Sequence, residues 1–327
     1  MVTHNNQEKL NENTYTIIPL TGGLGNQLFQ YGFALFVRNL TKGEVKIDIA
    51  LGNPRLTCGQ TSILNLELNQ DIRIEQKPSS SFEKLYSKAY GWILSRKLKV
   101  EIDNGFIEKL GVLIAKLILC LKYRSLLKVQ SADNLGYDAN IKINKRNLLI
   151  GYFQTYLYSS NSQVFKELHS VKLKKIGKKH EAIRSQIENQ KALLIHVRLT
   201  DYLKEQHFGI PSISYYEKSL DQITTIRNYD RIWIASDDLM LCREILKDLD
   251  TKVPISYLDD ADLTDVEVWD LFRRFSGYII SNSSFSWWAA FLRKDINAPV
   301  FCPYPWFQGM EEPKSLIPPG WHRVGSL

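Results

Sequence analysis

The sequence predicts an α/β protein whose C-terminal half is a doubly wound parallel sheet. The chain has 327 residues, which suits two domains or one large α/β domain. Apolar residues make up 44% and charged residues 24%, the balance of a folded protein rather than a disordered one. Short apolar runs also alternate with helix-length amphipathic segments, a pattern typical of buried parallel strands joined by helices.

The N-terminal half begins with a recognisable strand, turn and helix. Residues 15–20 form a β-like run, and the glycine-rich segment TGGLGNQ follows at 21–27. Apolar residues then recur at helical spacing over 28–40, with Gly43 as a suitable stop. A second strand is expected at 45–50, and residues 52–147 predict several helices without defined bounds.

The C-terminal half has a clearer pattern. Strands are expected at 192–198, 231–236, 254–258, 277–281 and 298–302, and helices at 214–226, 239–246, 264–275 and 284–294. Thr264 and Glu267 form a capping box at one helix start. We therefore expect a flexible N-terminus at 1–14, an N-terminal α/β domain at 15–155 and a C-terminal Rossmann-like domain at 156–327.

Polar residues gather where the predicted strands end. Open parallel sheets bind ligands at the carboxyl ends of their strands. The residues at these ends are Arg198, Asp201, Ser236, Asp237, Asp238, Asp259, Asp260, Ser281, Asn282, Ser283 and Ser284. An arginine, several carboxylates and a hydroxyl-rich helix start favour a nucleotide ligand.

The segment HVRLTDY at 196–202 places His196 and Arg198 on one face of a strand. A forked, permanently charged arginine suits a pyrophosphate that gains negative charge as it leaves. The alternative is structural: His196 would be a hydrogen-bonded core residue, and Arg198 the partner of a nearby carboxylate.

The segment GGLGNQ at 22–27 lies between a strand and a helix, where backbone N–H groups can face an anion. Gly23 and Gly25 match two positions of the dinucleotide fingerprint, but Leu28 replaces its third glycine. With Asn26 and Gln27, this run is a donor-binding candidate, and a plain tight turn is the alternative.

Two further runs bear on the site. In SNSSFSWW at 281–288, small hydroxyl residues open a helix that two tryptophans bury, which suits a phosphate. In ASDD, adjacent carboxylates point apart, so we expect no metal site there. Asp237 would accept hydrogen bonds from a nucleotide, and Asp238 would cap the next helix.

Taken together, four segments resemble glycosyltransferase family 11, the α-1,2-fucosyltransferases that use GDP-fucose. They are GGLGNQLFQYGFALF (22–36), HVRLTDY (196–202), ASDD (235–238) and SNSSFSWWAAFL (281–292), in family order. The resemblance implies a GT-B-like fold, with two Rossmann-like domains facing a cleft. It also implies inverting, metal-independent transfer of fucose to a hydroxyl, the 2-OH of a galactoside, in glycans of the O-antigen kind.

The resemblance also assigns roles to residues. Arg198 would hold the donor pyrophosphate, and Asp270 in WDLFRR would hold the guanine. The family's second arginine is Leu199 here, so Lys204 or the GGLGNQ amides would have to replace it. The base that takes the acceptor proton would be Asp201, Glu205 or His207, and the sequence leaves these three open.

GDP-fucose is then a substrate, and we expect no cofactor. Two other functions stay open: a non-catalytic module that binds a sugar nucleotide, and an NAD-linked oxidoreductase, suggested by the glycine-rich turn and Asp48. The acceptor and the oligomeric state cannot be read from the sequence.

The net charge of +7 is concentrated in one segment. Residues 84–128 hold ten Lys and Arg residues against three acids, an excess equal to that of the whole chain. Apolar residues interleave with them, so the segment either lies on an anionic membrane or forms a helix with a solvated lysine-rich face. We expect no nucleic-acid partner.

The same sequence features indicate where the protein works. The first twenty residues do not read as a signal peptide, and the four cysteines are scattered. The apolar run at 110–121 is shorter than the roughly 20 residues that cross a bilayer. We expect a cytoplasmic protein, peripheral at the inner face of the membrane if the basic segment binds lipid, where a lipid-linked acceptor would be found.

Overall fold

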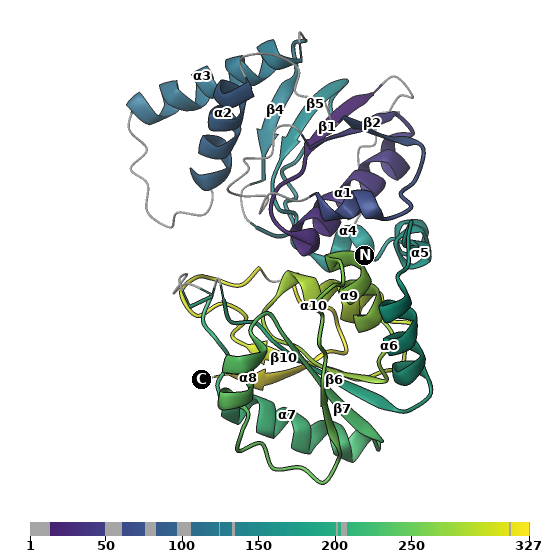
Figure 1. The fold of residues 1–327 in the computed structure, drawn as a ribbon. Coiled ribbons are helices and arrows are strands. Elements are labelled where there is room, and N and C mark those ends of the chain that lie inside the picture. The colour runs from purple at the N-terminus through teal and green to yellow at the C-terminus, as the bar shows by residue number, and fades with distance from the viewer. Residues whose placement is uncertain are drawn as a thin grey trace. The chain divides into compact units, whose positions relative to one another are not determined.

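The computed structural model describes residues 14–49, 61–75, 83–96, 106–123, 125–132, 135–200, 202–203, 208–313 and 315–326. The chain divides into two compact units, which are coloured from purple to teal and from teal to yellow in Figure 1. The first comprises the described residues of Met1–Leu64, Leu68–Val171 and Pro313–Leu316, and the second those of Asn65–Glu67, Lys172–Glu312 and Ile317–Leu327.

The first unit contains a parallel sheet of five strands in the order β3-β2-β1-β5-β4. The strands are β1 (Tyr15–Pro19), β2 (Glu44–Asp48), β3 (Ile72–Glu75), β4 (Lys128–Ser131) and β5 (Arg146–Ile150). Each paired neighbour runs parallel. Ile17 and Ile18 are adjacent in β1 and both fully buried, so both faces of the sheet are covered.

The helices of this unit are α1 (Leu24–Thr41), α2 (Glu83–Arg96), α3 (Phe106–Lys122), α4 (Tyr156–Ser159) and α5 (Ser162–Ser170), with a 3₁₀ turn at Ser62–Asn65 beside the unit boundary. Helix α1 begins earlier than its apolar periodicity indicates. At its C-terminus the left-handed residue is Lys42, with φ of 57°. The expected stop, Gly43, serves another purpose: a Cβ there would collide with Thr14.

The boundary between the units lies after Val171, later than the expected position near residue 155. The reason is that α4 and α5 pack against α1 of the first unit. Thr155 also donates a hydrogen bond from Oγ1 to the carbonyl of Ser315, 2.9 Å away, in the short segment that returns to this unit.

The second unit contains a parallel sheet of six strands in the order β11-β10-β9-β6-β7-β8. The strands are β6 (Ala192–Val197), β7 (Arg231–Ser236), β8 (Ile255–Tyr257), β9 (Gly277–Ile279), β10 (Val300–Tyr304) and β11 (His322–Gly325). The five predicted strands are present. The sixth, β11, was missed because HRVG has no apolar run, and only its parallel pairing with β10 makes it a strand.

The described residues of this unit form five helices: α6 (Lys178–Glu188), α7 (Ile213–Ile226), α8 (Leu239–Ile245), α9 (Asp265–Phe272) and α10 (Ser284–Phe291). Four of them were predicted, and the capping box of Thr264 and Glu267 at α9 is confirmed. Helix α6 was missed because KKHEAIRSQIE is mostly polar and exposed, with only His180 and Ile187 buried.

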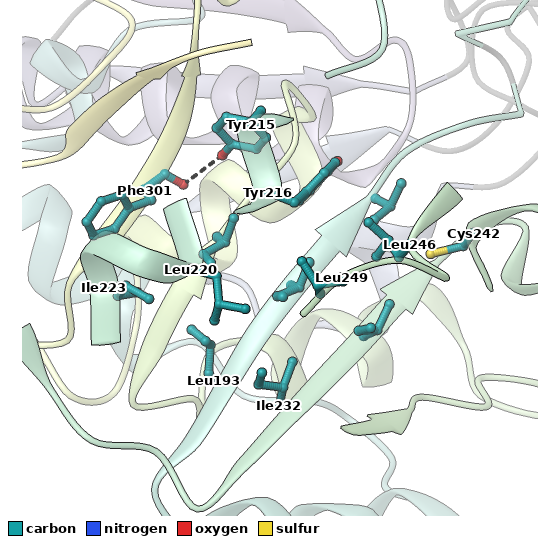
Figure 2. Close-up of a cluster of buried hydrophobic side chains, with 14 of the residues drawn as sticks. Leu193, Tyr215, Tyr216, Leu220, Ile223, Ile232, Cys242, Leu246, Leu249 and Phe301 are labelled. Carbon is teal, nitrogen blue, oxygen red and sulfur yellow. Dashed lines mark hydrogen bonds between the residues drawn. The ribbon is translucent and has the colours of Figure 1, made fainter. Parts of the chain in front are cut away.

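The core of the second unit lies between α7 and the sheet (Figure 2). Tyr215, Leu220 and Ile223 of α7 pack with Leu193 of β6 and Ile232 of β7. The Tyr215 hydroxyl donates to the carbonyls of Ile280, at 2.5 Å, and Phe301, at 3.3 Å. These bonds hold the start of α7 against the residue after β9 and the first part of β10.

The predicted α/β class is confirmed, since each of the two units contains a parallel sheet with helices between its strands. Among the described helices, none combines the length and the hydrophobicity needed to cross a bilayer.

Candidate functional site

The predicted site residues of the second unit follow three neighbouring strands, β9, β6 and β7. Arg198 comes directly after β6, Ser236 ends β7, and the run from Ser281 to Ser284 joins β9 to α10. Because these strands are adjacent and parallel, their carboxyl ends lie on one edge of the sheet. The structure thus groups these residues at one edge, as the strand pattern predicted.

Arg198 forms an ion pair with Asp237, with 3.3 Å between Nε and Oδ2. About a third of the Arg198 side chain is exposed. Asp237 also accepts hydrogen bonds from the backbone N–H groups of Leu199, at 2.8 Å, and Thr200, at 3.1 Å, and from the Thr200 hydroxyl. The carboxylate therefore fixes both the turn after β6 and the guanidinium at that turn.

The pKa of Asp237 is lowered although burial opposes this shift. The hydrogen bond from Thr200, the charge of Arg198 and the two backbone N–H groups outweigh the cost of burial. Asp237 is therefore ionised at neutral pH. The structure contains the carboxylate partner that was the structural alternative for Arg198. Contact between Arg198 and a pyrophosphate stays a prediction.

Leu199 is fully buried in the core of the second unit. At this position the resembling family carries its second arginine, whose charged side chain would not fit an apolar environment. What Leu199 contributes to the site is its backbone N–H, which binds Asp237. Lys204, a proposed replacement for that arginine, lies outside the described residues.

His196 is a buried hydrogen-bonding residue between β6 and α10. Its Nδ1 lies 2.9 Å from Ser286 Oγ and 3.1 Å from Ser281 Oγ, and its ring meets the edge of Phe272. Burial, aided by the charge of Arg198, lowers the pKa of His196 to about 3. The ring is therefore neutral, and it joins the end of β6 to the start of α10.

This buried histidine should make stability depend on pH. Unfolded His196 takes up a proton near pH 6.5, whereas the folded ring does not until about pH 3. The unfolded state thus binds more protons, so the contribution of His196 to the free energy of unfolding falls by about 2 kcal/mol from pH 7 to pH 5. We expect His196→Asn, measured by urea unfolding at both pH values, to lose most of this slope.

The matched control for that measurement is His322→Asn, since His322 is exposed. It should keep the slope of the wild type. An unchanged slope in His196→Asn would contradict the assignment of a neutral buried imidazole.

The run from Ser281 to Ser284 is largely buried: Ser281, Asn282 and Ser283 are buried, and Ser284 is partly exposed. Asn282 Nδ2 donates to the carbonyls of Phe208, Gly209 and Trp306 at 2.7, 3.0 and 3.1 Å. The Tyr202 hydroxyl donates to the Asn282 carbonyl at 2.9 Å. Asn282 thus ties the segments around residues 202, 208 and 306 to the start of α10.

Ser283 is the N-cap residue of α10, and its side chain makes no capping hydrogen bond. Ser284 is the first helical residue and is partly exposed. Trp287 and Trp288 are fully buried, as predicted. The first N–H groups of a helix lack intrahelical partners and favour anions, so this start offers donors beside the strand ends.

Asp238 caps α8, as predicted, because its Oδ1 accepts from the backbone N–H of Leu241 at 3.0 Å. Ser236 Oγ accepts from the N–H of Asp238 at 3.1 Å and is buried. Both side chains shape the turn after β7. Their contact with a donor stays a prediction.

Asp270 of α9 lies in a buried cluster of charges with His180 of α6 and with Arg273 and Arg274, which follow the end of α9. Its Oδ2 lies 3.1 Å from His180 Nε2, and it accepts from Arg274 Nε and Nη2 at 3.0 and 2.7 Å. Arg273 Nη1 is 3.8 Å from Oδ1, and its side chain is fully buried. Against the cost of burial, His180 and both arginines lower the pKa of Asp270 to about 2.

The carboxylate of Asp270 is therefore ionised and bound by its own neighbours, with 3% of the residue exposed. Its role as a guanine ligand stays a prediction. Arg273 and Arg274, just after the end of α9, are close to Asp270 in sequence, so these two partners could have been found. His180, ninety residues away in sequence, carries no such signal.

The glycine-rich run belongs to the first unit. Gly22 has φ of +79°, and a Cβ there would meet Asn26 at 2.5 Å, so Gly22 is the position that requires glycine. Gly23 is the exposed N-cap of α1, and Gly25 lies in its first turn. The sequence interpretation chose Gly23 and Gly25 and missed Gly22.

Two side chains of this run hold the turn. Gln27 is buried, donates to the Gly22 carbonyl at 2.9 Å and accepts from the Ile63 N–H at 3.1 Å. Asn26 Oδ1 accepts from Gln154 Nε2 at 2.9 Å. The Gln27 side chain is engaged within the turn, and contact between the first backbone N–H groups of α1 and a donor phosphate stays a prediction.

Some of the predicted site residues lie outside the described residues. One residue that contacts His196 was not predicted. The three candidates for the base, Asp201, Glu205 and His207, are not described. Ser286 was missed, although a hydroxyl in the apolar helix SFSWWAAF signals a buried partner. In the parts of the chain that are described, no group of three His, Cys, Asp or Glu side chains could hold a metal ion.

Comparison with known proteins identifies two relatives from Escherichia coli. The O-antigen biosynthesis glycosyltransferase WbnK is 26% identical over 309 residues, which cover 90% of this chain and 96% of the relative. An alpha-1,2-colitosyltransferase is 24% identical over 319 residues, 93% of this chain and 97% of the relative. The fucosyltransferase NodZ from Bradyrhizobium matches at 11% identity and a TM-score of 0.44, over 86% of this chain and 92% of its own, a likeness too weak to carry an argument.

The profile of glycosyl transferase family 11 matches residues 129–304, more than half of the chain. This range contains the strand end with Arg198, the ASDD turn and the serine-rich start of α10. The chain belongs to glycosyltransferase family 11.

Proposed function

We propose that this glycosyltransferase transfers L-fucose from GDP-fucose to the 2-OH of a galactoside in a glycan, with inversion and without a metal ion. The observation that carries the proposal is the guanidinium of Arg198, paired with Asp237 at the carboxyl end of β6 on a partly exposed side chain. A guanidinium fixed before the reaction stabilises charge that develops on a leaving pyrophosphate.

The proposed reaction is a single displacement at the anomeric carbon. The bond from that carbon to the β-phosphate oxygen breaks, and its electron pair leaves with GDP. The acceptor oxygen forms the new bond on the opposite face, and its proton passes to a base, for which Asp201, Glu205 and His207 are the candidates. Arg198 and the first N–H groups of α10 would bind the departing phosphates.

The donor sugar has a second candidate, because one relative is an alpha-1,2-colitosyltransferase. Turnover of GDP-fucose compared with the same nucleotide carrying colitose separates the two candidates. Faster turnover of the colitose donor would overturn the fucose assignment while leaving glycosyl transfer intact.

The test of the nucleotide is a thermal-shift comparison. A ligand that binds the folded state at about a hundred times its Kd stabilises it by roughly 2.7 kcal/mol. We expect GDP and GDP-fucose to raise the melting temperature and NAD to leave it unchanged. A shift with NAD alone would favour the oxidoreductase interpretation.

Catalysis is tested by a screen of galactosides with labelled GDP-fucose, with each acceptor present and absent. Transfer that requires an acceptor, with the product linkage determined by NMR, supports the proposal. Binding of GDP-fucose with neither transfer nor hydrolysis would favour a non-catalytic binding module.

We also expect activity to survive EDTA. Arg198 and the start of α10 would supply the charge stabilisation that a divalent ion supplies in other transferases. The measurement is the initial rate before and after chelation, with magnesium or manganese added back. Loss of activity restored by either ion would contradict metal-independent transfer.

A further inference from the structure

Helix α3 carries an exposed apolar stripe along its length. Leu110, Leu113, Ile114, Leu117 and Leu121 are between 45% and 70% exposed. Their spacing places all five on one side of the helix. Scattered exposed leucines are ordinary, but five large ones in one stripe mark an interaction surface.

Helix α2 extends this stripe into a groove. Leu85 and Trp92 are 46% and 40% exposed, and they line a groove of about 660 Å³ with Ile114 of α3. Gly111 lets the two helices approach, because a Cβ there would meet the Trp92 ring at 2.5 Å. Figure 1 shows α2 and α3 side by side.

We call this surface the α2–α3 face. It comprises Leu85, Lys88, Trp92, Leu110, Leu113, Ile114, Leu117 and Leu121.

The opposite side of the helix pair already covers the domain's own core. Tyr90, Ile93 and Leu94 of α2, with Ala115 and Leu119 of α3, are buried against β1, β4 and β5. The apolar stripe is therefore additional to the side that packs on the sheet.

The C-terminal end of α3 is anchored, so the helix cannot roll its stripe inward. Lys122 Nζ lies 3.1 Å from Asp48 Oδ2, and both side chains are buried. The Tyr123 hydroxyl donates to the same oxygen at 2.7 Å. Breaking a buried ion pair is costly, so this anchor holds the α2–α3 face toward solvent.

The lysines described on these helices indicate what the face binds. In sequence the segment 84–128 has ten Lys and Arg residues against three acids, but Lys122 is buried in its ion pair with Asp48, and residues 97–105 and 124 lie outside the described residues. Lys88 lines the groove itself, and Lys84 and Lys128 are exposed. A second copy of this chain would bring the same positive excess against itself, whereas an anionic surface is complementary to it.

We propose that the α2–α3 face binds the surface of a membrane that contains anionic lipids. The helix pair lies in the plane of the interface, its apolar stripe enters the acyl boundary, and its lysines contact the headgroups. This proposal does not depend on the donor or acceptor of the transferase.

The test is co-sedimentation of the full chain with vesicles of phosphatidylcholine alone or mixed with phosphatidylglycerol. We expect capture by the anionic vesicles only, lost between 0.1 M and 1 M salt, where the Debye length falls from about 10 Å to about 3 Å. Leu113→Gln with Leu117→Gln should weaken partitioning more than about tenfold, since it removes apolar burial. Lys84→Glu with Lys88→Glu should weaken it by about tenfold or more.

Matched control variants distinguish loss of the α2–α3 face from a general change in charge or hydrophobicity. Lys174→Glu with Lys175→Glu makes the same charge change at exposed lysines of the second unit, and Met240→Gln with Ile296→Gln removes exposed apolar residues there. Both control pairs should bind vesicles as the wild type does, and unchanged melting temperatures show that all variants fold.

Three results would overturn the proposal. The first is no capture of the protein by anionic vesicles at low salt. The second is a loss of vesicle binding in the control variants equal to that in the variants of the face. The third is a wild-type dimer that Leu113→Gln with Leu117→Gln converts to a monomer, with no vesicle capture. The last result would assign the face to a second copy of the chain.

Discussion

Replacing Arg198 with alanine is expected to lower the turnover of GDP-fucose by about 10²–10³-fold, the usual effect of removing one preorganised donor from a site of developing charge. The guanidinium lies 3.3 Å from Asp237, and about a third of the Arg198 side chain is exposed. The measurement is the initial rate of transfer at saturating donor. Asp237 keeps its backbone N–H donors in the variant, so the turn after β6 should survive.

Two further variants make this result interpretable. Arg198→Lys keeps the charge but not the fork, so it should recover only a small part of the rate. Arg184→Ala removes a half-exposed arginine, paired with Glu188, from α6 and should leave the rate unchanged. Near wild-type turnover in a folded Arg198→Ala variant would exclude a role for this arginine in catalysis.

Asp270→Asn is expected to destabilise the second unit by about 3–5 kcal/mol, because it leaves the buried Arg273 without its carboxylate partner. Urea unfolding at neutral pH measures the loss. Glu188→Gln is the matched control, since Glu188 pairs with the same Arg274 from a more exposed position. Its expected loss is about 1 kcal/mol or less.

The same variant tests the guanine assignment separately. If Asp270 binds the base, the folded variant should lose the difference in melting-temperature shift between GDP and ADP. If Asp270 only neutralises its buried neighbours, that difference persists while stability falls. An Asp270→Asn protein as stable as the wild type would contradict the structural role.

Much of the second unit could be predicted from sequence, because its signals are local. Buried parallel strands are short apolar runs, so β6, β7, β8, β9 and β10 stand out between amphipathic helices. The Thr264 and Glu267 capping box spans three residues. The place of Arg198 followed from one general rule, that polar residues after parallel strands share an edge.

Less of the first unit could be predicted from sequence, because some of its strands depend on pairing with their neighbours. β3 and β4 are short and partly exposed, and they are strands because β2 and β5 offer them hydrogen-bonding edges. The requirement for glycine at position 22 likewise follows from a positive φ that no local pattern distinguishes from its neighbours.

The sequence by itself determined the parallel α/β class, the strand ends that carry the candidate site and the excess of positive charge in one segment. Only the tertiary structure decided which groups are neutral, paired or exposed. His196 is neutral because burial and the charge of Arg198 lower its pKa, and part of its surroundings comes from Ser286, ninety residues away. Asp270 is bound by His180, also ninety residues away. Likewise, periodicity makes α3 amphipathic, but the Lys122 pair with Asp48 and the packing of Leu119 decide which side faces water. Contacts between distant residues set burial and therefore charge, and no local pattern contains them.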